Sequence, residues 1–138
     1  MMEDQRLHIL LVEDDQVDVM QVQRAFQKAR ITNPIHVASN GIEALAKLRD
    51  GSLGPRRLVL LDINMPRMNG IEFLREMRAD ADLQPTCVVV LTTSNEERDK
   101  MEAYKLNVAG YLLKPVNFAD FVEMMGALNK YWTLVEMP

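Results

Sequence analysis

Five short apolar runs, separated by longer amphipathic segments, constrain the fold of this 138-residue chain more than any other feature. The runs are rich in Val, Ile and Leu and do not alternate with polar residues, which is typical of strands buried on both faces of a parallel sheet. We therefore predict five strands, over residues 7–13, 35–38, 58–62, 87–92 and 110–113.

The segments between and after these runs carry apolar residues at helical spacing. The clearest pattern follows the fifth run, where one apolar face is formed by Phe118, Phe121, Val122, Met125 and Leu128. The pattern that follows the fourth run is weaker. Five strand–helix units in succession predict an α/β fold, a doubly wound five-stranded parallel sheet with five helices on its two faces.

The composition sets limits on the class of protein. The chain is 48% hydrophobic and 26% charged, as globular proteins are, and its length fits a single domain over residues 1–138. The net charge of −4 argues against binding to a nucleic-acid backbone, which needs a basic face. The acidic start does not resemble a signal peptide, and no apolar run approaches the roughly 20 residues of a membrane span. We therefore expect a cytoplasmic protein that binds neither nucleic acid nor membrane.

Charged side chains come directly after three of the apolar runs. The first run ends in Glu13, Asp14 and Asp15, the third ends in Asp62, and Lys114 follows the fifth. The simplest role for Asp15 is to cap the first helix. Ligands of doubly wound sheets bind beyond the carboxyl ends of the strands, where the strand order reverses. If the first and third strands are neighbours, as in the order 2-1-3-4-5, the other carboxylates converge on one small area.

Carboxylates brought this close repel one another, and a hard divalent cation relieves the repulsion. Oxygen ligands, without a cluster of Cys and His, favour Mg²⁺ over zinc or copper. Lys114 supplies a compact positive charge for an anion. A carboxylate nucleophile, a magnesium ion and a lysine are the groups needed to accept a phosphoryl group. The sequence therefore predicts an aspartyl phosphate on Asp62.

Four motifs at the strand ends resemble those of the response-regulator receiver domains of bacterial two-component signalling. They are "LLVEDD", "LVLLDINMPRMNG", "VVVLTTS" and "GYLLKP", and they occur in the family's order. The resemblance covers residues 7–130, which leaves a C-terminal tail over residues 131–138. It implies the flavodoxin-like, CheY-like receiver fold with strand order 2-1-3-4-5, and phosphorylation by a sensor histidine kinase. It also implies a signalling phosphoacceptor that only dephosphorylates itself, rather than an enzyme.

The resemblance implies a role for each residue that matches the family's metal site. Asp62 would be the phosphoacceptor and would contact the Mg²⁺ cofactor. Asp14 would bind the metal directly, and Glu13 would bind it through water. Asn64 would offer its backbone carbonyl. Glu13 departs mildly from the family pattern, because many members have Asp at this position.

The resemblance also implies a phosphate-binding group and a switch. Lys114 would pair with a phosphoryl oxygen and precede Pro115 in a cis peptide bond. Thr92 would donate a hydrogen bond to another phosphoryl oxygen. Tyr111 would be the aromatic residue that changes position with Thr92.

Two other functions remain open from the sequence. A small phosphatase of the haloacid-dehalogenase type also uses an aspartate, Mg²⁺ and a lysine, but it needs a second acid where this chain has Asn64. A degenerate receiver, acting as an adaptor without phosphorylation, would be expected to lack Asp62, Thr92 or Lys114, and all three are present. Thr92 and Tyr111 also suit ordinary strand and core positions.

The ten residues after Leu128 are too few for a DNA-binding unit, so we expect output through protein contacts. The ending "YWTLVEMP" resembles stand-alone regulators paired with bacterial phytochromes. The expected partners are a cognate sensor histidine kinase, with a phytochrome as the narrower candidate, and a downstream protein or phosphotransfer protein.

The C-terminal tail predicts self-association. Trp132 continues the apolar face of the last helix and is expected to close the core, while Leu134, Val135 and Met137 lie beyond it. Apolar residues at a terminus indicate a contact surface or a tail folded back on the domain. Receiver domains that resemble this one dimerise through the fourth helix, fifth strand and fifth helix. We therefore predict a homodimer whose interface includes residues 132–137.

Overall fold

The computed structural model describes residues 6–65 and 67–136 of the chain. Strands and helices alternate throughout this part. In chain order the elements are β1 (His8–Val12), α1 (Gln16–Lys28), β2 (Ile35–Ala38), α2 (Gly41–Arg49), β3 (Arg57–Leu61), α3 (Gly70–Ala79), β4 (Cys87–Thr92), α4 (Glu97–Lys105), β5 (Gly110–Leu113) and α5 (Phe118–Leu134).

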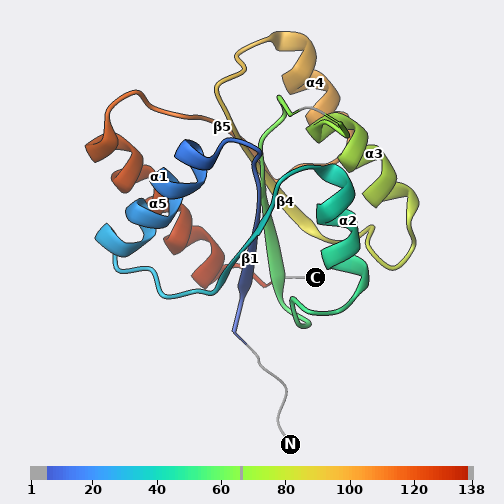
Figure 1. Cartoon of the computed structure of the whole chain (residues 1–138), viewed down its shortest axis with the longest axis horizontal. Coiled ribbons are helices and arrows are strands. Elements are labelled where there is room, and N and C mark those ends of the chain that lie inside the picture. The colour runs from blue at the N-terminus through green and yellow to red at the C-terminus, as the bar shows by residue number, and fades with distance from the viewer. Residues whose placement is uncertain (1–5, 66, 137–138) are drawn as a thin grey trace, which may run out of the picture.

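The five strands form one parallel sheet in the order β2-β1-β3-β4-β5, which confirms the predicted fold class (Figure 1). β1 and β3 are neighbours, and Val12 lies opposite Leu61 at their carboxyl ends. Both strands end one residue earlier than predicted. Glu13 and Asp62 therefore lie just beyond the carboxyl ends of these two neighbouring strands.

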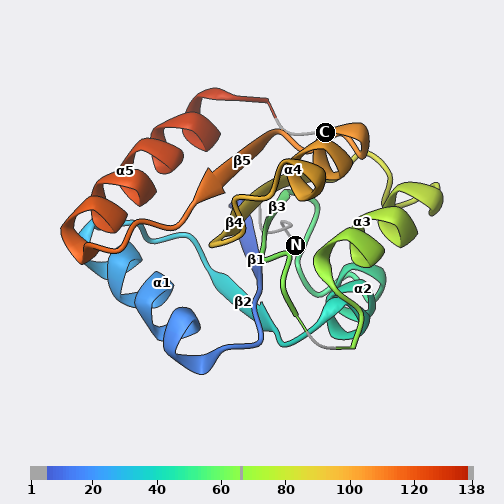
Figure 2. The same ribbon diagram turned by 90° about the horizontal axis from the view of Figure 1, so that it is seen from above.

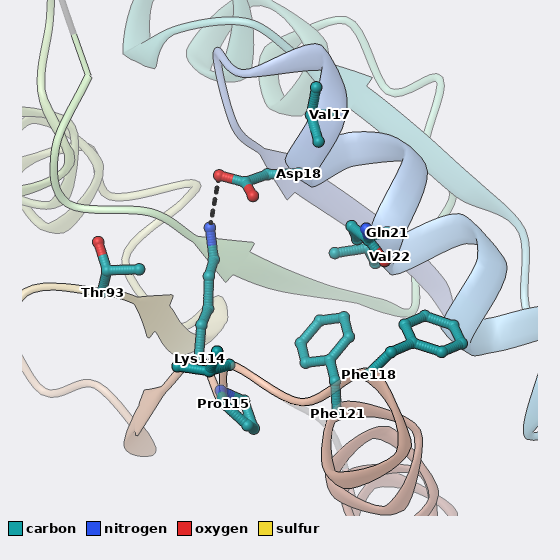
Figure 3. Close-up of a pocket in the computed structure, with 10 residues that line it drawn as sticks. Val17, Asp18, Gln21, Val22, Thr93, Lys114, Pro115, Phe118 and Phe121 are labelled. Carbon is teal, nitrogen blue, oxygen red and sulfur yellow. Dashed lines mark hydrogen bonds and ion pairs between the residues drawn. The ribbon is translucent and has the colours of Figure 1, made fainter.

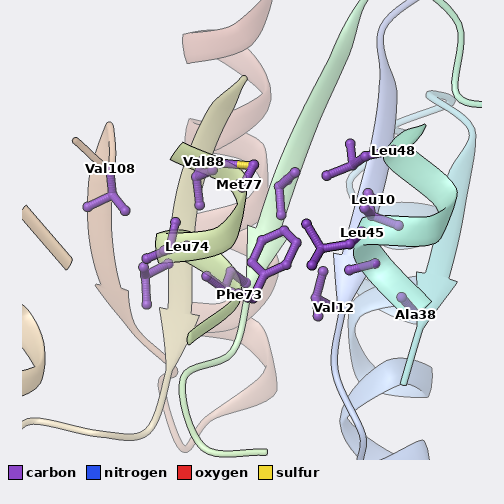
Figure 4. Packing of buried hydrophobic residues seen from close by; sticks show 14 of the residues in the cluster. Leu10, Val12, Ala38, Leu45, Leu48, Phe73, Leu74, Met77, Val88 and Val108 are labelled. Atoms are coloured by element: carbon purple, nitrogen blue, oxygen red, sulfur yellow. The ribbon is translucent and has the colours of Figure 1, made fainter. Parts of the chain in front are cut away.

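The helices cover the two faces of the sheet unequally, with α1 and α5 on one face and α2, α3 and α4 on the other (Figures 1 and 2). Each face has its own hydrophobic core. On the α2–α3–α4 face, Phe73, Leu74 and Met77 of α3 pack against the strands (Figure 4). Burial of each such side chain stabilises the fold by roughly 1.5–3 kcal/mol, so both layers hold the strand ends in fixed positions.

Side-chain caps start the helices that follow β1 and β3. Asp15 accepts a hydrogen bond from the backbone N–H of Val17 at 2.8 Å, which confirms that it caps α1. Asn69 and Glu72 form a reciprocal capping box at the start of α3. These caps satisfy backbone N–H groups that would otherwise lack partners and fix where each loop ends.

The last helix closes the core on the α1 face. Trp132 is 2% exposed, and its ring lies 5.9 Å from that of Phe26, as its predicted core role requires. α4 packs against the sheet less extensively than the other helices, since Ala103 is its one buried residue. Across residues 6–65 and 67–136, no helix combines the length and apolar character needed to cross a membrane.

Candidate functional site

Three carboxylates meet where β1 and β3 end. Glu13, Asp14 and Asp62 each place a carboxylate oxygen within 4.8 Å of the other two. The sheet's hydrogen bonding extends to two of them, because the N–H of Glu13 donates to the carbonyl of Ala38 and that of Asp62 to the carbonyl of Val12. Glu13 is 2% exposed and Asp62 is 7% exposed. The prediction that these three acids converge is confirmed.

The cluster suits a hard divalent cation. Its ligands are all oxygen atoms, and octahedral Mg²⁺ at roughly 2.1 Å from each ligand spans about 4.2 Å between opposite oxygens. The carboxylate oxygens of the three residues lie within 4.8 Å of one another, so they are near enough to share one such ion. Burial raises the pKa of Glu13 to about 7, because the hydrogen bond from Lys114 offsets only part of the desolvation. A bound cation would favour the ionised form of this carboxylate.

Lys114 reaches this cluster from the end of β5. Its Nζ lies 2.6 Å from Oε2 of Glu13 and 3.3 Å from Oδ2 of Asp18, and its side chain is 12% exposed. Burial alone would lower the pKa of Lys114, but the hydrogen bond from its ammonium to Glu13 and the charges of Glu13, Asp62 and Asp18 outweigh it and raise the pKa. Lys114 therefore stays an ammonium at neutral pH.

The predicted cis peptide bond before Pro115 is wrong, because the peptide bonds of the described residues include no cis bond. A trans bond is the ordinary state before proline, which favours it by about 0.5–1 kcal/mol. The backbone N–H of Lys114 still donates to the carbonyl of Thr92 at 2.9 Å, and this bond fixes the start of the Lys114 side chain beside β4.

Thr92 and Tyr111, the predicted switch residues, are linked through Ser94. Thr92 is fully buried at the end of β4, and its hydroxyl oxygen accepts a hydrogen bond from the N–H of Ser94 at 3.2 Å. The Tyr111 hydroxyl donates to the Ser94 carbonyl at 2.8 Å. The Ser94 hydroxyl donates to Asp99 of α4 at 2.6 Å. A change at Thr92 can therefore reach α4 and β5 through one residue.

The loop after β3 passes close to the backbone of the acidic cluster. A Cβ atom on Gly70 would lie 2.6 Å from the carbonyl oxygen of Asp62 and 2.8 Å from the Cα of Ile63. Both neighbours are backbone atoms that cannot move aside without displacing Asp62. Only glycine fits at this position, which accounts for the Asn69–Gly70 pair that follows the third apolar run.

A pocket of about 290 Å³ adjoins the site between α1, the loop after β5 and α5 (Figure 3). Its wall is mainly apolar and includes Phe118 and Phe121. Asp18 and Lys114 also line it, and Lys114 joins the pocket to the acidic cluster through its contact with Glu13.

The structure places most of the predicted site residues together. Asn64 lies two residues after Asp62, is exposed and lines a different groove, toward α4. Its carbonyl as a metal ligand stays a prediction. Sequence reasoning did not identify Asp18 or Ser94. The sequence signal for Asp18 was an acid in the first turn of the first helix, where negative charge is favourable.

The fold and this site define a receiver domain, and comparison with known proteins gives the same result. Residues 9–126 match the response regulator receiver domain family, so the chain belongs to that family. The acidic cluster of Glu13, Asp14 and Asp62 is consistent with the family's phosphoacceptor site.

Two relatives with known sequences match most of the chain. The chain is 37% identical over 128 residues to response regulator Rcp1 of Synechocystis sp., covering 90% of this chain and 87% of that protein. It is 38% identical over 127 residues to the "Probable methanogenesis regulatory protein FilR2" of Methanothrix harundinacea, covering 90% and 82%.

Two solved structures of response regulators are also similar. The phosphorylated cyanobacterial phytochrome response regulator RcpA has a TM-score of 0.85 at 31% identity, covering 98% of this chain and 99% of that one. The Mn²⁺-bound form of Rcp1 has a TM-score of 0.82 at 36% identity, covering 96% and 99%. A divalent metal is thus present in a structure of a relative.

Proposed function

We propose that this protein is a response regulator that accepts a phosphoryl group on Asp62 from a sensor histidine kinase, with Mg²⁺ as cofactor. The observation that carries the proposal is the buried Asp62 carboxylate inside a cluster of three acids, with the Lys114 ammonium 2.6 Å from Glu13 in the same cluster. The phytochrome-associated regulators among its structural relatives support a phytochrome as the kinase.

The proposed reaction transfers the phosphoryl group without change in oxidation state. An oxygen of the Asp62 carboxylate attacks phosphorus, and the bond from phosphorus to the donor nitrogen breaks, leaving its electron pair on the donor histidine. Lys114 pairs with a phosphoryl oxygen, and the hydroxyl of Thr92 donates to another. Asp14, Asp62, the Asn64 carbonyl and, through water, Glu13 would hold Mg²⁺, which would supply positive charge beside the phosphoryl oxygens.

Treatment with acetyl phosphate and Mg²⁺, followed by intact-mass measurement, tests this function. We expect a chain that gains the mass of one phosphoryl group with Mg²⁺ and gains none with excess EDTA. Continuous release of inorganic phosphate without an adduct would indicate a hydrolase. A chain that neither gains mass nor releases phosphate would be an adaptor that works without phosphorylation.

We predict that Thr92→Ala separates phosphorylation from signalling. The variant keeps Asp62 and Lys114, so it should still be labelled. It lacks the hydroxyl that would pull the Ser94 loop inward and allow Tyr111 to move. Hydrogen exchange in the β4–α4 loop and β5 should change on phosphorylation of the wild type and stay unchanged in Thr92→Ala. The neighbouring Thr93→Ala is the control, and wild-type exchange that phosphorylation leaves unaltered would argue against the switch.

We further propose a homodimer through α4, β5 and α5. Large apolar side chains are exposed on these elements, including Met101 (57%), Tyr104 (50%), Leu113 (39%) and Leu134 (85%). Trp132 is buried in its own chain, so it would pack beneath the interface residues and would not contact the partner. Met137, part of the predicted interface, lies outside the described residues.

Deletion of residues 133–138 is expected to shift the protein from dimer to monomer in light scattering. The truncation retains Trp132, so the core should stay closed. Leu134→Ser is the companion variant, since a residue this exposed can be changed without loss of core packing. A full-length chain that is monomeric at high concentration, both with and without phosphoryl group, would remove the dimer.

A further inference from the structure

The Lys114 ammonium contacts two carboxylates, and one of them lies outside the acidic cluster. Asp18 of α1 accepts from Nζ at 3.3 Å, while Glu13 accepts at 2.6 Å (Figure 3 shows the Asp18 contact). The two residues of the Asp18–Lys114 pair are 96 positions apart in the chain. Asp18 thus connects the first turn of α1 to the group that is proposed to bind the phosphoryl oxygens.

The stability of α1 explains why an acid occurs at position 18, but it does not explain why the Asp18 carboxylate contacts Lys114. Asp18 lies in the first turn of α1, where negative charge is favourable toward the helix dipole. Helical side chains point back toward the N-terminus. This direction carries the Asp18 carboxylate toward the strand ends, and Lys114 extends from β5 to meet it (Figure 3).

The geometry indicates which of the two contacts opens when a phosphoryl group arrives. Glu13 is 2% exposed and is also fixed through Oε1, which accepts from the N–H of Asp15 at 3.2 Å. The Asp18 side chain is 40% exposed, and its contact with Nζ is the longer one. A released Asp18 carboxylate can be solvated by water, whereas a released Glu13 carboxylate would stay buried.

We propose that Asp18 is a positioning residue that holds Lys114 in a resting arrangement, and that this contact must open before Lys114 can pair with a phosphoryl oxygen on Asp62. The inference rests on the proposed function. Asp18 does not contact the phosphoryl group and acts only through the lysine. It therefore slows phosphorylation of the resting protein.

The predicted effect is an acceleration on removal of the charge. A partly exposed ion pair contributes up to about 1 kcal/mol, which corresponds to roughly a five-fold change in an equilibrium. Asp18→Asn should therefore raise the second-order rate constant for phosphorylation by acetyl phosphate about three- to five-fold at saturating Mg²⁺. Asp18→Glu, which keeps a carboxylate on a longer arm, should restore a rate near that of the wild type.

Two comparisons separate this role from simple repulsion between Asp18 and an anionic donor. Asp120→Asn removes the same charge from the first turn of the neighbouring helix α5. It should leave the rate unchanged. In a Lys114→Met background, Asp18→Asn should have no effect, because the residue through which it acts is absent.

The full chain is used throughout, with labelling followed by intact mass. An unchanged rate in Asp18→Asn, an equal acceleration in Asp120→Asn, or an acceleration that persists without Lys114 would each overturn the inference while the wild type still labels. A wild-type chain that takes up no phosphoryl group would overturn the proposed function and this inference with it.

Discussion

Asp62→Asn should abolish phosphoryl labelling and leave the fold intact. The amide has nearly the same shape as the carboxylate but lacks its nucleophilic charge, so attack on phosphorus is lost altogether. Removal of one of three clustered carboxylates also relieves their mutual repulsion. The melting temperature of the variant should therefore be at least that of the wild type. Intact mass after acetyl phosphate treatment and circular dichroism on heating check the two expectations.

The control for this variant is Asp82→Asn, an exposed aspartate in the turn after α3. It should be labelled as the wild type is. That result would show that removal of an arbitrary acidic residue does not abolish labelling. If Asp62→Asn were fully labelled, the nucleophile would be another residue, and peptide mapping would identify it. The assignment of Asp62 would then be wrong even though the chain belongs to the receiver family.

The positions of Glu13 and Asp62 are predictable from sequence because a parallel strand buried on both faces must be a continuous apolar run. The first acid after such a run marks the carboxyl end of the strand. The strand order then brings two such ends together, and the structure confirms that order. Lys114 also follows its apolar run directly, although β5 is a half-buried edge strand rather than a strand buried on both faces.

Asp18 and Ser94 could not be predicted in the same way. The contact of Asp18 with Lys114 depends on the path of a long side chain between elements 96 residues apart. Ser94 accepts the hydrogen bond from Tyr111 through its backbone carbonyl, a group that every residue type carries. A sequence pattern records neither of these properties, so they require coordinates.

The other large effect concerns Arg78, whose guanidinium donates hydrogen bonds to four backbone carbonyls. The distances are 2.7 Å to Leu106, 2.6 Å to Gln84, 2.8 Å to Thr86 and 2.9 Å to Asn107. These carbonyls belong to the loop before β4 and to the connection between α4 and β5. One side chain of α3 therefore holds both connections. They lie at the amino ends of the strands, whereas the acidic cluster lies at the carboxyl ends.

Arg78→Met is expected to lower the free energy of unfolding by about 2–4 kcal/mol. Methionine retains the apolar stem but leaves four carbonyls without their charged donor, and such hydrogen bonds contribute about 1.5–3 kcal/mol each before discount for partial exposure. For a chain of this length the loss corresponds to a melting temperature lower by roughly 7–14 °C. Urea denaturation and calorimetry measure the two quantities.

Arg75→Met is the matched control, because Arg75 lies one helical turn earlier on α3 and its guanidinium pairs with Glu102 at 3.1 Å on the surface. With side chains 58% and 35% exposed, this pair should contribute less than about 1 kcal/mol. A similar loss of unfolding free energy in both variants would mean that hydrogen bonds from water replace those from Arg78 to the four carbonyls at little cost. Since β5 follows the α4–β5 connection and leads directly to Lys114, the larger loss expected for Arg78 would show that this arginine stabilises the connection before the strand that precedes Lys114.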